Sequence, residues 1–335
     1  MAEDRQLELW DAAEAGDPAG VLAALARGAD PDQPLPGSEY RAWLADPKRR
    51  KARVVNDSGL TDKKFYVLFE ALEKSAVLEA LLTARPRLDV VNDNYYEDRP
   101  TAVHQLVHPW YREEEDDHAP ALLKSLLAAG APLERLYQGH TPLQLICRRK
   151  GRLDLLEILL AHGASVKVID QEGYSILHLA TVDWSFEELW LRESIARGTY
   201  HTADGQPVGL GRAGWMRLDQ SDYYKPIGPY TPKAEDDLYD PASLWGVREV
   251  VKALVAAGAD PNAVNPHTGD TPLHMRSDGR IHLESMEALL EFGARADIRN
   301  HDGCLPSDFF FREDDPEALA LQRRMIAMAP ECTSF

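Results

Sequence analysis

The stretch "GDTPLHM", from Gly269 to Met275, places a Thr-Pro pair and a histidine among apolar residues. A histidine here could be a metal ligand, a catalytic base or a framework residue. Threonine before proline is typical of a helix N-terminus. The Thr271 hydroxyl can accept a backbone N–H, and Pro272 stands at the first helical position, where its missing N–H costs nothing. We expect Leu273 to point into the core, and His274 to hydrogen-bond back to Thr271 or across to a neighbouring unit.

Copies of this stretch recur at near-regular intervals. The clearest are "RPTAVH" from Arg99, "GHTPLQ" from Gly139, "GYSILH" from Gly173 and "GCLPSD" from Gly303. The steps from 139 to 173 and from 269 to 303 are both 34 residues. Because His104, His178 and His274 occur once per copy and do not converge, we predict that they are structural. Thr141 and Gln144 have the spacing of a capping box.

A second series of motifs has the same period. Apolar, helix-like runs end at a glycine that would form a left-handed C-terminal cap, at Gly130, Gly163, Gly258 and Gly293. Together the two series, G-x-T-P-L-H and L-L-x-x-G-A-D, resemble the ankyrin repeat family over nearly the whole chain. The resemblance implies an all-α solenoid of stacked helix pairs with projecting β-turns.

The expected organisation is one domain over residues 1–335, with about seven or eight repeats. Insertions are expected at about 34–64, 111–118 and 205–243, and a C-terminal cap at about 303–330. The 60 residues between Gly198 and Gly258 predict one degenerate repeat with extra material, following a helix at 185–198.

The composition limits the classes of partner. The formal charge of −18 disfavours nucleic acid and favours a protein partner, possibly a basic one. Three widely spaced cysteines argue against a disulfide framework or a thiolate zinc site, and Cys147 is expected in the core. With no apolar run of transmembrane length and no signal segment in "MAEDRQLELW", we expect a monomeric cytoplasmic protein without membrane contact.

Variable positions at the turns and insertions are the expected binding surface, because framework residues of a repeat array are buried against their neighbours. Aromatic and histidine side chains there are the candidate partner-binding residues. They are Tyr95, Tyr96, Trp110, Tyr137, Tyr223, Tyr224, Tyr230, His267 and His301.

Motifs for nucleotide binding, zinc proteases and serine hydrolases do not occur, and no cofactor or metal is expected. We therefore predict non-catalytic protein–protein recognition through a concave groove, the turn tips and the insertions. Two alternatives stay open at this point. One is an inhibitor or immunity-type protein that neutralises a basic enzyme or toxin. The other is a secreted effector or ligand-binding protein that uses the 205–243 insertion.

Overall fold

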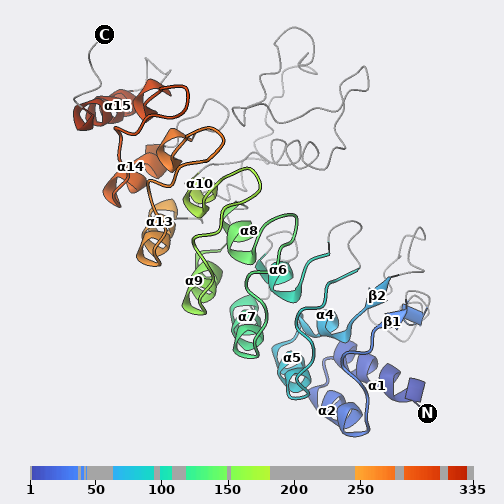
Figure 1. Cartoon of the computed structure of the whole chain (residues 1–335). Helices are drawn as coiled ribbons and strands as arrows, with labels where there is room; N and C mark the ends of the chain where they lie inside the picture. The colour runs from blue at the N-terminus through green and yellow to red at the C-terminus, as the bar shows by residue number, and fades with distance from the viewer. Residues whose placement is uncertain are drawn as a thin grey trace, which may run out of the picture. The chain divides into compact units, whose positions relative to one another are not determined.

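The computed structural model describes residues 2–36, 39–40, 43, 63–93, 99–107, 118–148, 152–181, 246–275, 283–309 and 316–329 (Figure 1). Contacts divide the chain into two compact units. The first is Met1–Ile146 with Asp154–Ala164, and the second is Cys147–Leu153 with Ser165–Phe335.

Short helices in pairs make up most of the described chain. The earlier elements are α1 (Ala2–Ala15), α2 (Pro18–Ala26), β1 (Leu35–Pro36), β2 (Lys64–Phe65), α4 (Val67–Ala71), α5 (Ser75–Leu82), α6 (Ala102–Val107), α7 (Ala119–Ala128), α8 (Pro142–Arg148) and α9 (Leu153–Ala161). The later ones are α10 (Ile176–Thr181), α13 (Val247–Ala256), the 3₁₀ turn η3 (Pro272–His274), α14 (Leu283–Glu291), η4 (Pro306–Phe309) and α15 (Pro316–Met328). Among the described residues, strands form only the short antiparallel pair β1–β2, so the all-α prediction is confirmed.

Aromatic residues anchor the start of the first unit. Trp10 of α1 is buried and meets Tyr40 and Trp43 edge to face, with ring centroids 5.6 and 5.3 Å apart. Tyr40 in turn stacks on Phe65 of β2 at 3.9 Å. The Trp43 indole N–H donates to Asp11 at 2.9 Å. Part of the expected insertion at 34–64 therefore packs against the first helices as a small satellite core.

The predicted glycine caps are confirmed. Gly130, Gly163, Gly258 and Gly293 have φ of 92°, 88°, 97° and 101°, the left-handed conformation that ends a helix with little strain only at glycine. The similar stretch "LLTARPRLDVVN", which ends at Asn92, has Arg85 in place of the glycine, at φ 53°. A side chain in this region of backbone space is uncommon, so this turn carries local strain.

The repeated histidines join one repeat to the next. In the second unit, His274 Nδ1 accepts the Thr271 N–H at 3.0 Å, and its Nε2 lies 3.2 Å from the Cys304 carbonyl. Likewise, His178 Nδ1 accepts the Ser175 N–H at 3.1 Å, and its Nε2 lies 3.0 Å from the Asp270 carbonyl. Both imidazoles are buried, as the sequence predicted for structural groups.

The first unit uses the same device. His104 Nδ1 is 2.7 Å from the Thr101 hydroxyl, and its Nε2 is 3.3 Å from the His140 carbonyl. At the next copy a glutamine replaces the histidine: Gln144 accepts the Thr141 N–H at 3.0 Å, and the Gln144 N–H donates to the Thr141 hydroxyl at 3.3 Å. The predicted capping box is therefore confirmed.

These bonds correct the predicted degenerate repeat. His104 and His274 each reach the carbonyl that precedes the helix start in the next copy of the motif, at His140 and Cys304. His178 reaches the equivalent carbonyl of Asp270, 92 residues further on. The copy at Gly173 is therefore followed in space by the copy at Gly269, and α10 packs against α13. The prediction that another repeat is stacked between these two copies is therefore wrong, because His178 reaches the second copy directly. The predicted helix at 185–198 lies outside the described residues.

The buried histidines predict a pH-dependent stability. Burial lowers the pKa of His104 and of His178 from 6.5 to about 4. Between these values the unfolded chain binds protons that the folded chain does not. The contribution of these neutral histidines to the free energy of unfolding is therefore fully present above pH 6.5 and is lost as the pH falls toward 4. At about 1.4 kcal/mol per pH unit, each histidine contributes at most about 3 kcal/mol to this loss.

Denaturant unfolding followed by circular dichroism at several pH values between 7 and 4.5 measures the effect. The change His178→Gln should flatten the curve, because Gln144 shows that glutamine makes the cap without titrating. The matched change at the exposed His267 should leave the curve unaltered. Equal slopes for His178→Gln and the parent chain would contradict this assignment.

The corrected order of repeats predicts that the stretch between α10 and α13 can be shortened. Four residues, 149–152, are enough to join α8 to α9. Replacing residues 182–245 with a Gly/Ser linker of about eight residues should leave the melting temperature within a few degrees, since loop length has a weak effect on stability. If a packed repeat lay in this interval, the deletion would instead lower the melting temperature steeply and expose apolar surface to a dye.

Candidate functional site

Three turns of the second unit share one construction. Each begins with a buried Asp or Asn, namely Asp170, Asn265 and Asn300. Asp170 Oδ1 accepts the N–H groups of Glu172 and Tyr174 at 3.0 and 2.8 Å. Asn300 Oδ1 accepts those of Asp302 and Cys304 at 3.1 and 2.9 Å. A short polar side chain that bonds its own turn in this way fixes the conformation of the loop.

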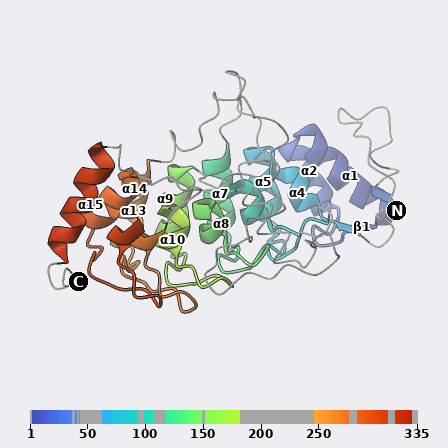
Figure 2. The ribbon, with the colours of Figure 1, turned by 90° about the horizontal axis from the view of Figure 1, so that it is seen from above.

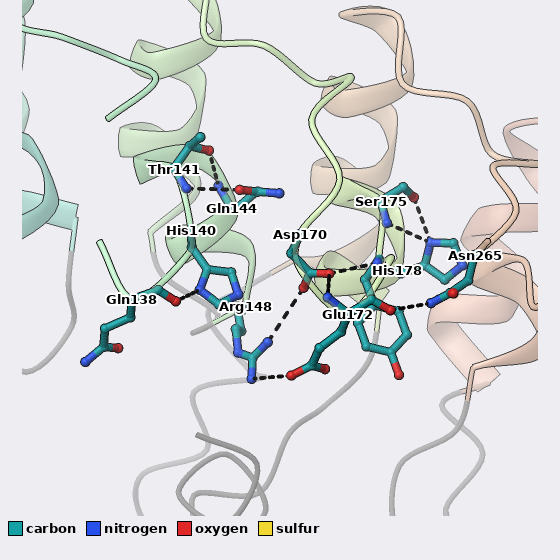
Figure 3. Close-up of polar contacts among 11 residues, drawn as sticks. Gln138, His140, Thr141, Gln144, Arg148, Asp170, Glu172, Ser175, His178 and Asn265 are labelled. Atoms are coloured by element: carbon teal, nitrogen blue, oxygen red, sulfur yellow. Dashed lines mark hydrogen bonds and ion pairs between the residues drawn. The ribbon is translucent and has the colours of Figure 1, made fainter. Parts of the chain in front are cut away.

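The same side chains tie neighbouring turns together. Asn265 Nδ2 donates to the Glu172 carbonyl at 3.0 Å (Figure 3), and Asn300 Nδ2 donates to Asp270 Oδ1 at 2.8 Å. The His301 N–H donates to the Thr268 carbonyl at 2.9 Å. The turns of the second unit are therefore bonded side by side, and they lie along one side of its helices (Figure 2).

Glycine is required where two turns meet. Gly173 has φ 84°, and a Cβ there would lie 2.6 Å from Asn265 Oδ1 and 2.9 Å from the His267 ring. Gly269 has φ 77°, and a Cβ there would clash with the His301 backbone and ring. The glycine that opens each motif thus permits close approach of the next turn as well as the turn conformation itself.

A buried ion cluster supports the first of these turns. Arg148, at the end of α8, has its Nη1 3.8 Å from Asp170 Oδ2 and its Nη2 4.0 Å from Glu172 Oε1 (Figure 3). The Arg148 and Asp170 side chains are each 2% exposed. Sequence reasoning missed this cluster. The available signal was the helical spacing, which puts Arg148 one turn after the buried Gln144 and Leu145.

The histidines expected at the turn tips lie together, whereas the tyrosine does not. His267 and His301 are exposed, and the His301 ring nitrogen Nδ1 lies 3.3 Å from the His267 carbonyl. Tyr137 is buried, with its ring centroid 5.4 Å from that of His104. The prediction that Tyr137 contacts a partner is therefore wrong, because its ring fills the space beside the joining histidine. The remaining candidates lie outside the described residues: Tyr95, Tyr96, Trp110, Tyr223, Tyr224 and Tyr230.

The described residues include the exposed histidines of the turn tips and the buried histidines that join repeats. No group of three or more His, Cys, Asp or Glu that could hold a metal ion occurs among them. None of the helices in the described ranges has the length and apolar character needed to cross a membrane. The buried imidazoles are engaged in joining repeats, and Cys147 is buried, as expected.

The ion cluster predicts that loss of Arg148 alone destabilises the chain more than loss of the charges of Arg148 and Asp170 together. Arg148→Leu should destabilise the chain by about 3–5 kcal/mol, since it leaves the Asp170 carboxylate buried without its guanidinium. Adding Asp170→Asn should recover more than half of the loss, because Asn300 shows that asparagine makes the same turn bonds. Denaturant unfolding measures both.

The control is Arg248→Ala, which breaks an exposed ion pair with Glu291 at 2.7 Å and should cost less than about 1 kcal/mol. If Arg148→Leu behaved like this control, the buried cluster would have no structural role.

Comparison with known proteins agrees with the turn and helix geometry. Residues 138–171 match the family model described as Ankyrin repeat. The chain is 29% identical over 199 residues to human "Ankyrin repeat and SOCS box protein 16", a match that covers 55% of this chain and 43% of that protein. It is 26% identical over 209 residues to "E3 ubiquitin-protein ligase KEG" of Arabidopsis thaliana, which covers 56% of this chain and 13% of that protein.

The chain thus spans less than half the length of these curated relatives, so their complete activities do not follow for it. The family model covers the repeat that contains the Thr141–Gln144 capping box and ends at the turn that opens with Asp170. The histidine bridges and asparagine-bonded turns extend the same construction beyond the matched residues. Residues 138–171 thus form an ankyrin repeat, and the chain is similar to ankyrin-repeat proteins over about half of its length.

Proposed function

We propose that the protein is a non-catalytic, monomeric protein-binding solenoid of ankyrin repeats in the cytoplasm, forming one domain over residues 1–335. The helix pairs in the described part of the chain, from α1–α2 to η4–α15, support seven repeats. The insertions at about 34–64, 111–118 and 205–243 and the cap at about 303–330 belong to the same proposal.

The observation that carries the proposal is the row of bonded turns. Asp170, Asn265 and Asn300 hold the turn backbones, so the exposed tips lose little conformational freedom when a partner binds. His267 and His301 stand on two neighbouring tips and supply polar, planar contact surface. The aromatic candidates outside the described residues, such as Tyr95 and Tyr224, would extend this surface.

Net charge favours a basic region on the partner. A charge of −18 speeds the approach of a basic protein and disfavours acidic ones, and this steering weakens with salt. Neutralisation of a basic enzyme or toxin is the narrower form of this function. It predicts an association rate that falls steeply between low and physiological ionic strength.

Histidine footprinting tests the proposal. A partner is first isolated on the immobilised chain and purified. Diethyl pyrocarbonate labelling of the free chain should modify the exposed His267 and His301 and spare the buried His178 and His274. In the complex, labelling of His267 and His301 should fall at least fivefold, while the exposed His162 serves as the reference.

The double change His267→Ala and His301→Ala should weaken binding of that partner about tenfold or more, the effect of removing contacts worth about 1.4 kcal/mol. His162→Ala is the matched control. Unchanged labelling of both tip histidines in the complex, or equal affinity of the double variant, would show that the partner binds elsewhere.

A further inference from the structure

A second surface lies next to the tips, on the residues that directly precede the buried Asp and Asn of each turn. These positions are occupied by Ile169, Val264 and Arg299, and all three are exposed. The two aliphatic side chains are 54% and 49% exposed, so each presents apolar surface to solvent.

Hydrogen bonds fix these three residues in one register. The N–H of Asp170 donates to the Tyr174 carbonyl at 3.0 Å, and that of Asn300 to the Cys304 carbonyl at 3.0 Å. The Asn265 N–H donates to the Asp270 carbonyl at 2.8 Å, which closes the middle turn in the same way. Because the turns are also bonded to one another, Ile169, Val264 and Arg299 form a row with the spacing of packed repeats, roughly 10 Å.

Two exposed cations lie close to the aliphatic pair in the chain or in the row of turns. Lys167 is exposed two residues before Ile169, and Arg299 follows Val264 in the row. The Arg299 guanidinium donates to the Gly303 carbonyl, which holds it over its own turn. We name Lys167, Ile169, Val264 and Arg299 the turn-base strip.

Two carboxylates that precede these turns in the chain have local partners. Asp297 makes a two-point ion pair with Arg295, at 3.0 and 2.7 Å. Asp260 accepts the Asn262 N–H at 2.8 Å. The cations Lys167 and Arg299 are exposed beside apolar surface, and their charge is opposite in sign to the net charge of the chain.

We propose that the turn-base strip binds an extended acidic peptide segment. Two apolar side chains of the peptide cover Ile169 and Val264, and flanking carboxylates pair with Lys167 and Arg299. Charge complementarity selects this occupant, because a basic peptide would meet two cations and a neutral one would leave both unpaired. The strip is separate from the tip residues His267 and His301, so it adds a second surface to the proposed function and does not depend on it.

Fluorescence anisotropy with defined peptides tests the proposal on the full chain. The probe is a labelled peptide of about twelve residues designed for the extended polyproline II conformation. It carries two leucines three positions apart, which in that conformation lie on the same side about 9 Å from each other, and two glutamates on each side of them. It should bind, and binding should weaken severalfold when salt is raised from about 50 to 500 mM. A peptide with lysines for glutamates, and one with serines for leucines, should each bind at least tenfold more weakly.

Variants locate the site. Ile169→Ser with Val264→Ser, and separately Lys167→Glu with Arg299→Glu, should each weaken binding of the acidic peptide about tenfold. The matched control is Ile326→Ser with Lys252→Glu, which changes an exposed aliphatic and an exposed cation of the same unit and should stay within twofold. Lys167→Glu alone is the second test should the double charge variant alter the circular dichroism spectrum.

Three results would overturn the proposal: no binding of the acidic peptide at about 1 mM, equal or tighter binding of the lysine peptide, or no effect of the strip variants. The double change His267→Ala and His301→Ala should leave peptide binding unaltered. Failure at the strip and failure at the tips are therefore seen separately.

Discussion

The structure depends on the bonds that three buried imidazoles, those of His104, His178 and His274, make from one repeat to the next. Nδ1 accepts from the N-terminus of its own helix, and Nε2 lies within hydrogen-bonding distance of a carbonyl in the following turn. One neutral ring thus satisfies a helix end and sets the distance to the next repeat. The acceptor role of Nδ1 needs the uncharged ring, and burial favours that form by lowering the pKa of His178.

Joining repeats in this way allows the chain to carry extra sequence without disturbing the framework. His178 and Asp270 are 92 residues apart, yet their contact matches that of His104 and His140, which are 36 residues apart. The framework residues are buried and bonded, whereas the turn tips carry exposed side chains. The binding surfaces proposed above lie on such positions, where side chains are exposed and their backbones are held.

The turn row shows how rigidity and recognition are combined. Buried Asp and Asn side chains hydrogen-bond to the backbone of their own turn or to the neighbouring turn. The backbone conformation of the turns is therefore fixed, and so are the positions of the exposed side chains that they carry. Arg148 also helps to fix the first of these turns, because its guanidinium balances the buried charge of the Asp170 carboxylate. The exposed residues are then free to differ in chemistry from one turn to the next.

Local sequence patterns were enough to predict the repeat, its helix starts and its glycine-capped ends, because Thr-Pro and Gly act on the backbone within a few residues. They were also enough to predict that the recurring histidines are structural. The folded chain was needed to show which copies are neighbours, that Tyr137 is buried, and that Arg148 pairs with Asp170 and Glu172. Those facts depend on contacts between segments far apart in the chain, and a local pattern cannot specify a partner that another repeat supplies.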